Sequence, residues 1–99
     1  MSTAGDIARE AARIIDGCRG STHGPIERGF ETAAALWSAY LGFAVSPSQV
    51  AQCMVLLKIA RSKHGAPNHR DHYVDGAGYS ALAGELAMTT APDSPEVYR

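Results

Sequence analysis

Apolar residues recur at helical spacing in four stretches of the chain, and glycine and proline separate these stretches. The first stretch predicts a helix from about Thr3 to Asp16, with Gly17 as the residue that ends it. The second predicts a helix from Pro25, which suits a first-turn position, to Gly42. The positions expected to face the core in these two helices are Ile7, Ala8, Ala11, Ile14, Ile15, Ile26, Phe30, Ala33, Trp37 and Leu41.

The third helix has the clearest start signal, because Ser46 and Gln49 form the pattern of a capping box and Pro47 occupies the first helical position. This helix is expected to end at Gly65. A fourth helix is expected from about residues 68–71 to Met88. The core positions expected in these two helices are Val50, Cys53, Met54, Leu57, Ala60, Val74, Ala77, Ala81, Leu82 and Leu86. Small residues on the fourth helix, Gly76, Gly78 and Gly84, would allow close packing.

These elements predict an all-α fold, a compact bundle of four helices with short loops. Neither alternating apolar and polar runs nor a hairpin signal is present. We expect residues 1–88 to form one domain and residues 89–99, with Pro92 and Pro95, to form a flexible or docking tail. A domain within a 99-residue chain buries a modest share of its surface. A homo-oligomer is therefore expected.

Composition narrows the range of functions. The net charge of −1 argues against binding to duplex nucleic acid. The two cysteines, Cys18 and Cys53, form no metal or disulfide pattern, which fits a reducing cytoplasm. The first residues lack the basic and apolar regions of a secretory signal, and no apolar run is long enough to span a membrane. We therefore expect a cytoplasmic protein that does not enter membranes.

Polar residues are densest around the start of the fourth helix, at His64, Asn68, His69, Arg70, Asp71, His72 and Asp75. Asp71 and Asp75 are four residues apart and share a helix face, so they would repel each other unless a cation or a basic group lay nearby. One interpretation is a divalent-cation site or an acidic clamp on a ligand. The other is that Asp71 favours the helix dipole and Asp75 pairs with Lys58 or Arg61. The histidine spacing matches no zinc motif.

Basic and aromatic side chains could bind a nucleotide. Lys58 and Arg61 share a face and could bind an anion together with Arg19, Arg28 or Arg70. The alternative is a solvated basic helix end. The loop that contains Arg19 and His23 could surround a phosphate with its backbone amides, although it has no Walker pattern. Aromatic residues that could stack on a base, or simply pack in the core, are Trp37, Tyr40, Tyr73 and Tyr79.

Several blocks of the sequence resemble a family of small bacteriophage proteins of unknown function. The most specific blocks are Leu-Trp-Ser-Ala-Tyr-Leu-Gly at residues 36–42 and Asp-Gly-Ala-Gly-Tyr at residues 75–79. The resemblance covers roughly Ile7 to Leu86. Members of that family carry Asp-Tyr-Gly in the first loop, where this chain has Thr-His-Gly at residues 22–24, and Asn-Phe where it has Gly29-Phe30.

The order of helices and the late aspartate are also distantly similar to MazG-like nucleoside triphosphate pyrophosphohydrolases. This similarity implies a magnesium-dependent hydrolase. This chain has no Glu-Glu-x-x-Glu cluster, so Asp71 and Asp75, with Glu27 or Glu31, would have to hold the ion.

Three functions follow, in order of preference. The first is a phage protein without catalytic activity or cofactor that binds and sequesters a nucleotide-derived molecule, such as a host immune signal. The second is the magnesium-dependent hydrolase, and the third is a module that binds a host protein. The residues predicted to bind the ligand are Arg19, His23, Trp37, Lys58, Arg61, His69, Asp71, Asp75 and Tyr79.

Overall fold

The computed structural model describes residues 2–18 and 25–89. In these two ranges the regular elements are four helices, and each boundary lies within about two residues of the expected one. The helices are α1 (Ala4–Cys18), α2 (Ile26–Leu41), α3 (Pro47–His64) and α4 (Arg70–Thr89). The all-α, four-helix prediction is confirmed.

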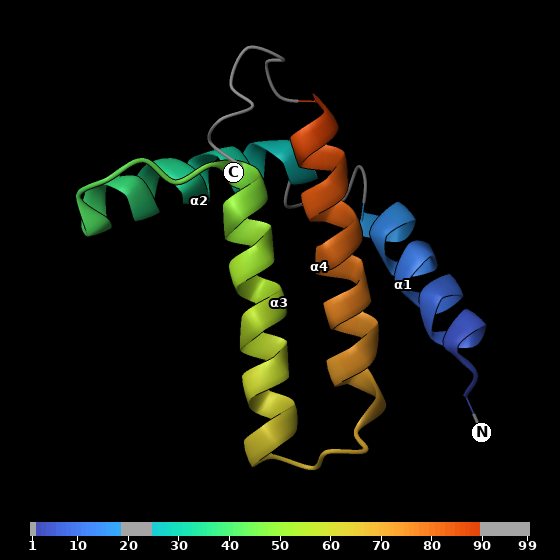
Figure 1. Cartoon of the computed structure of the whole chain (residues 1–99). Coiled ribbons are helices and arrows are strands. Elements are labelled where there is room, and N and C mark those ends of the chain that lie inside the picture. The colour runs from blue at the N-terminus through green and yellow to red at the C-terminus, as the bar shows by residue number, and fades with distance from the viewer. Residues whose placement is uncertain (1, 19–24, 90–99) are drawn as a thin grey trace.

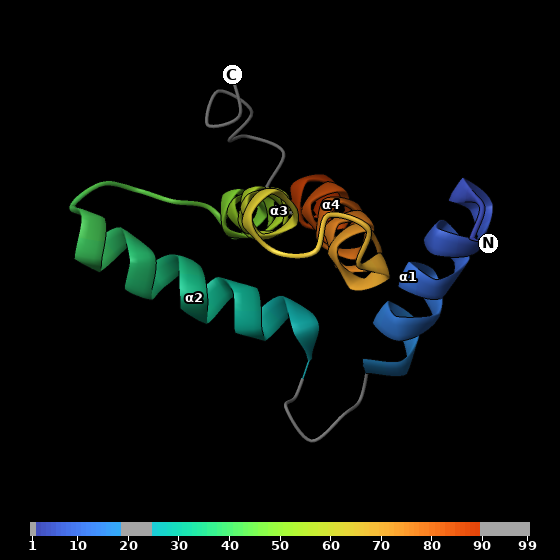
Figure 2. The same cartoon turned by 90° about the horizontal axis from the view of Figure 1, so that it is seen from below.

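The helices are arranged around one antiparallel pair. Figure 1 shows α3 and α4 side by side, with α1 leaning against α4. The view from below in Figure 2 shows α2 crossing this pair instead of running along it, so its second half extends away from the other helices. The architecture is therefore a helical hairpin to which α1 and α2 add separately.

Side-chain hydrogen bonds cap the N-termini of α3 and α1. Ser46 Oγ accepts a hydrogen bond from the Gln49 amide at 3.1 Å, and Gln49 Oε1 accepts one from the Ser46 amide at 2.9 Å. Thr3 and Asp6 form the same reciprocal pair at the start of α1, with both distances 3.1 Å. The amide of Thr3, aided by the Arg9 guanidinium, holds the pKa of Asp6 below its ordinary value.

The core is small and lies where α2, α3 and α4 meet. Ala51, Ala83 and Leu86 are buried there, and Phe30 of α2 packs against them. Two of these three buried side chains are alanine, so the apolar area removed from water at this point is modest. This agrees with the expectation that a domain of this size buries a modest share of its surface.

The buried face of α3 is only partly the expected one. Ser48 and Ala51 are buried, and Ser48 Oγ donates a hydrogen bond to the Ala83 carbonyl at 2.8 Å. Lys58, on the same side, pairs with α4. These inward polar groups have partners on α4. Several apolar side chains of α3 lie on its other sides and are exposed to solvent. The prediction that Cys53, Leu57 and Ala60 are buried is wrong: Leu57 is 39% exposed, and the other two are exposed as well.

Of the other residues predicted to lie in the core, some are buried and some are exposed. Ala11, Val50, Val74, Leu82 and Leu86 are buried as expected. The expected core residues Ala8, Ile14, Leu41 and Ala81 are exposed. Their helices contact neighbours along only part of their length or on one narrow side, which an apolar period alone does not reveal.

Among the glycines of α4, Gly78 is the one that packs against another helix. It is buried, and a methyl group added there would lie 3.7 Å from Cδ1 of Ile15 in α1. The same addition at Gly76 or Gly84 would meet nothing within 4 Å. The expected close packing of small residues therefore holds at Gly78 alone of these three.

Candidate functional site

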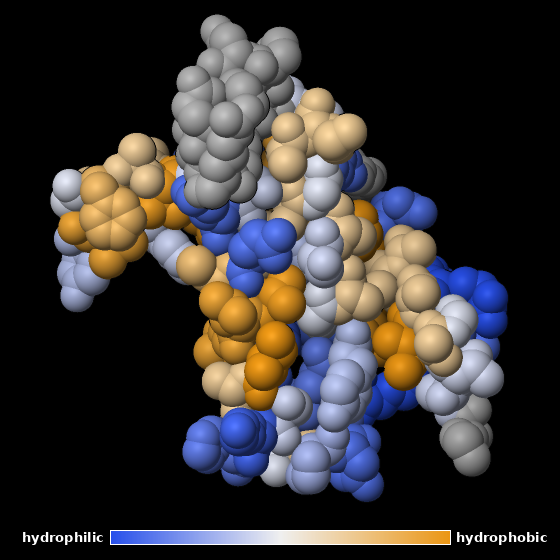
Figure 3. Space-filling model, in the orientation of Figure 1, coloured by the Kyte–Doolittle hydropathy of each residue, from blue (hydrophilic) through white to orange (hydrophobic). Residues whose placement is uncertain are grey.

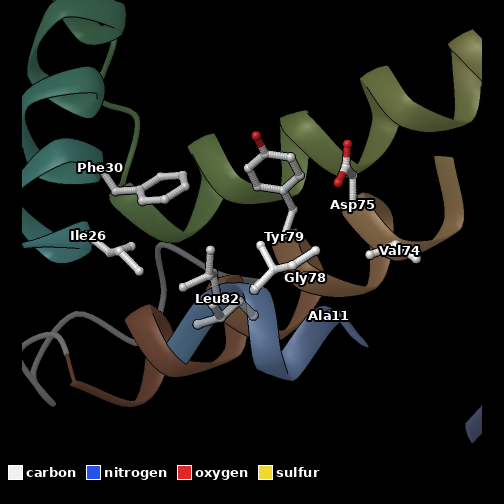
Figure 4. Close-up of a pocket in the computed structure, with 10 residues that line it drawn as sticks. Ala11, Ile26, Phe30, Val74, Asp75, Gly78, Tyr79 and Leu82 are labelled. Carbon is white, nitrogen blue, oxygen red and sulfur yellow. The ribbon is translucent and has the colours of Figure 1, made fainter. Parts of the chain in front are cut away.

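A cavity of about 240 Å³ lies where α1, α2 and α4 converge (Figure 4). Its walls are mostly apolar, which is typical of small-molecule sites. Gly78 is one of the lining residues, and a methyl group added there would lie 3.7 Å from Cδ1 of Ile15, which also lines the cavity. The main apolar lining residues are Ile14, Ile15, Ile26, Phe30, Val74 and Leu82.

An aromatic pair forms one side of the cavity. Phe30 extends from α2 toward Tyr79 of α4 (Figure 4). The two ring centroids are 6.5 Å apart and the ring planes are inclined by 76°, an edge-to-face arrangement. A planar ligand entering the cavity would meet aromatic surface contributed by two helices.

A carboxylate lines the cavity, and the ammonium group paired with it lies outside the lining. Asp75 lines the cavity, and its Oδ2 is 3.0 Å from Nζ of Lys58, which reaches across from α3. The Lys58 side chain is only 15% exposed, whereas that of Asp75 is 40% exposed. The carboxylate therefore keeps access to solvent and to a ligand, while the ammonium group is partly removed from water.

Lys58 also faces a second hollow. This hollow, of about 190 Å³, lies between α3 and α4 and is lined by Lys58, His72 and Tyr73 among others. The polar groups of the two aromatic residues already have partners: His72 Nε2 lies 3.1 Å from the Ala66 carbonyl oxygen, and the Tyr73 hydroxyl donates to the Pro67 carbonyl at 2.6 Å. These bonds fix the turn between α3 and α4.

The two aspartates that share a face have different partners. Asp75 pairs with Lys58, as one of the two interpretations of the sequence predicts. Asp71 is exposed in the first turn of α4, and its Oδ2 is 3.5 Å from Nε2 of His69. His69 and Asp71 do not line the cavity.

The remaining predicted site residues are scattered. Trp37 lies on the second half of α2, and Arg61 is exposed on α3. Arg70, suggested as a partner for Lys58 and Arg61 at an anion, instead binds Glu10 and Ser2. Arg19 and His23 lie outside the described residues. Of the nine predicted site residues, the cavity brings together Asp75 and Tyr79, with Lys58 beside them.

Phe30 and Gly78 line the cavity but were not predicted from the sequence to do so. Phe30 was predicted to be a core residue. It does pack against the core, but it also lines the cavity. Gly78 was noted only as a small residue. A sequence gives no direct signal for a cavity whose walls come from three helices far apart in the chain.

A comparison with protein families shows which family this chain belongs to. Residues 6–87 match the family described as a domain of unknown function, DUF6378. The chain belongs to this family. The match includes all of α2 and α3 and every residue that lines the cavity.

Two proteins similar to this DUF6378 chain are the Gene 55 proteins of Mycobacterium phages D29 and L5. The D29 protein is 43% identical over 74 residues, which cover 75% of this chain and 48% of that protein. The L5 protein is 37% identical over 83 residues, covering 83% of this chain and 53% of that protein. The DUF6378 chain thus spans about half the length of these relatives. No solved structure matches it.

These relatives support the resemblance to a bacteriophage family of unknown function, whereas the similarity to MazG-like hydrolases stays a prediction. Within residues 2–18 and 25–89, no three His, Cys, Asp or Glu side chains form a group suited to a metal ion. In the same ranges, no helix combines the length and apolar character needed to cross a membrane.

Proposed function

We propose that this phage protein binds a nucleotide-derived small molecule in the cavity between α1, α2 and α4 and holds it without chemical change. The observation that carries the proposal is the cavity itself. It is an apolar hollow that has the Phe30–Tyr79 pair on one side and, in its lining, Asp75, whose carboxylate pairs with Lys58 of α3. In an infected cell, such a protein would act in the cytoplasm by sequestering a host signal.

The size of the cavity limits what enters it. Drug-sized ligands occupy about 300–1,000 Å³. A hollow of about 240 Å³ suits one ring system and leaves the rest of a larger ligand outside. A nucleobase would place its faces against Phe30 and Tyr79, because aromatic surfaces attract planar rings.

The ion pair supplies the polar contacts. Asp75 accepts hydrogen bonds, so it suits an exocyclic amine or a ribose hydroxyl. Lys58 is the cation beside this carboxylate, and a phosphate that leaves the cavity on this side would share its ammonium group. Recognition of this kind needs a preformed site and no transition-state chemistry.

The hydrolase alternative would need Asp75 for magnesium. In the structure, Lys58 already neutralises this carboxylate, and the described residues hold no group of three suitable ligands. Magnesium sites that act on phosphoanhydrides use several carboxylates around the ion. Binding without hydrolysis is therefore the better supported function.

A ligand-retention experiment tests the proposal. The purified protein is mixed with nucleotides, cyclic dinucleotides and ADP-ribose derivatives in the presence of magnesium. The mixture is filtered, and molecules released from the retained protein by heat are identified by chromatography. We expect one compound class to be retained and recovered intact. Recovery of cleaved product would establish the hydrolase instead, and retention of no compound would overturn both small-molecule functions.

Two variants of the same helix make the experiment specific. Asp75→Asn removes the charge at the cavity and should weaken retention about tenfold or more, because a charged hydrogen bond contributes roughly 1.5–3 kcal/mol. Asp71→Asn removes a charge four residues away that does not line the cavity, and it should retain ligand like the parent. Equal losses in both variants would show that the ligand binds elsewhere.

A further inference from the structure

The second half of α2 carries an apolar surface that nothing in the described chain covers. Leu36, Trp37, Tyr40 and Leu41, which we call the arm face, surround an open hollow of about 500 Å³. Tyr40 is 90% exposed and Leu36 is 65% exposed. Figure 3 shows apolar side chains gathered at this free end of α2.

The arm is held in a fixed conformation although it extends into solvent. Gly42 ends α2 in the left-handed conformation, and its amide donates to the Ser38 carbonyl at 2.9 Å. The segment that returns to α3 is attached to the helix, because the Val45 amide donates to Ser38 Oγ at 2.8 Å. A rigid surface of this kind loses little conformational entropy when a partner covers it.

We propose that the arm face docks against the arm face of a second copy of this chain and forms a twofold dimer. In such an interface the same patch faces itself, so identical charges would oppose one another. The four residues of the arm face carry no charge, and Phe43, 64% exposed just beyond the helix, extends the apolar area. The net charge of the chain, −1, adds little repulsion.

The shape and the area of the patch also suit a second copy. A hollow bordered by protruding Tyr40 and Leu36 can receive the same side chains from an antiparallel α2 helix, as ridges fit into grooves. Aromatic side chains bury about 150–250 Å² each, and a stable interface needs about 800 Å² per partner. Leu36, Tyr40, Leu41 and Phe43 are 47–90% exposed. Together with the partly exposed Trp37, they provide the apolar area for such an interface.

Sedimentation of the whole chain over a range of concentrations tests the dimer. Trp37 is the single tryptophan, so its emission reports on the arm face directly. We expect a dimer whose Trp37 emission moves to longer wavelength as dilution separates the copies. A chain that sediments as a monomer at every concentration, with no shift of emission, would overturn the proposal.

Matched charge substitutions locate the interface. Leu36→Glu should raise the dimer dissociation constant about a hundredfold, because each copy would bury an unpaired carboxylate. Leu56→Glu on α3 is the control, since Leu56 is 63% exposed but lies outside the arm face. It should leave the dimer intact. A dimer that survives Leu36→Glu and dissociates with Leu56→Glu would place the interface on α3 and contradict the proposal. Circular dichroism verifies that each variant stays helical.

The dimer does not depend on the small-molecule function. The arm face and the cavity share no residue, so ligand retention and sedimentation report on them separately.

Discussion

The ammonium nitrogen of Lys58 lies 3.0 Å from Asp75 Oδ2 and joins α3 to α4 at the edge of the cavity. The two partners differ in their access to water. If the pair is broken, Asp75 can be hydrated where it stands, whereas the less exposed Lys58 side chain is hydrated less completely. Removing Asp75 and removing Lys58 should therefore change the free energy of unfolding by different amounts.

Asp75→Ala should lower the free energy of unfolding by about 1–3 kcal/mol, because it leaves a poorly hydrated ammonium group unpaired. Lys58→Met keeps the aliphatic contacts of the stem and should lower it by less than about 1 kcal/mol. In the Lys58→Met background, the second substitution should have little effect. Urea denaturation of the two single variants and the double variant measures these values. Additive losses would show that the ion pair contributes nothing of its own.

The limits of sequence interpretation are visible in α3. Its capping residues Ser46 and Gln49 were identified correctly, because a cap is local and its partners are three residues apart. Its buried face was predicted only in part, because Ser48 and Lys58 become acceptable inside only when α4 offers a carbonyl and a carboxylate. Burial of a polar residue depends on a partner that the local pattern does not contain.

The candidate site shows the same distinction. The pairing of Asp75 with Lys58 could be anticipated as one of two outcomes, since opposite charges on neighbouring helices attract. The cavity could not, because Phe30, Tyr79 and Ile15 come from three helices whose crossing is set by packing. A helical repeat of apolar residues predicts which side chains are buried. It does not show which residues pack against them or how completely they are buried.

Arg70 of α4 links this helix to the start of the chain, because it forms an ion pair with Glu10 of α1 and donates from Nε to Ser2 Oγ at 2.8 Å. Arg70→Gln should loosen α1 from α4 without disturbing the α3–α4 pair. We expect the amides of α1 to exchange with solvent about tenfold faster, which corresponds to about 1.4 kcal/mol of local stability. Hydrogen exchange followed by mass spectrometry measures this.

Arg9→Gln is the control for that experiment. Arg9 also forms an ion pair, with Asp6 at 2.9 Å, but both residues belong to α1 and the pair is exposed. Its removal should change exchange in α1 far less. If Arg9→Gln and Arg70→Gln accelerate exchange equally, the contact between α1 and α4 rests on apolar packing and not on Arg70.

Two glycines should respond to alanine in opposite directions. Gly84 lies within α4, and an added methyl group would meet nothing within 4 Å, so Gly84→Ala should raise the free energy of unfolding by about 1 kcal/mol. Gly42 has φ of 83°, where a side chain clashes with the backbone, so Gly42→Ala should lower it by about 1–2 kcal/mol. Urea denaturation at equal protein concentration compares the two. Destabilisation by Gly84→Ala would mean that this side of α4 is in close contact with another surface in solution, because the described chain leaves it open.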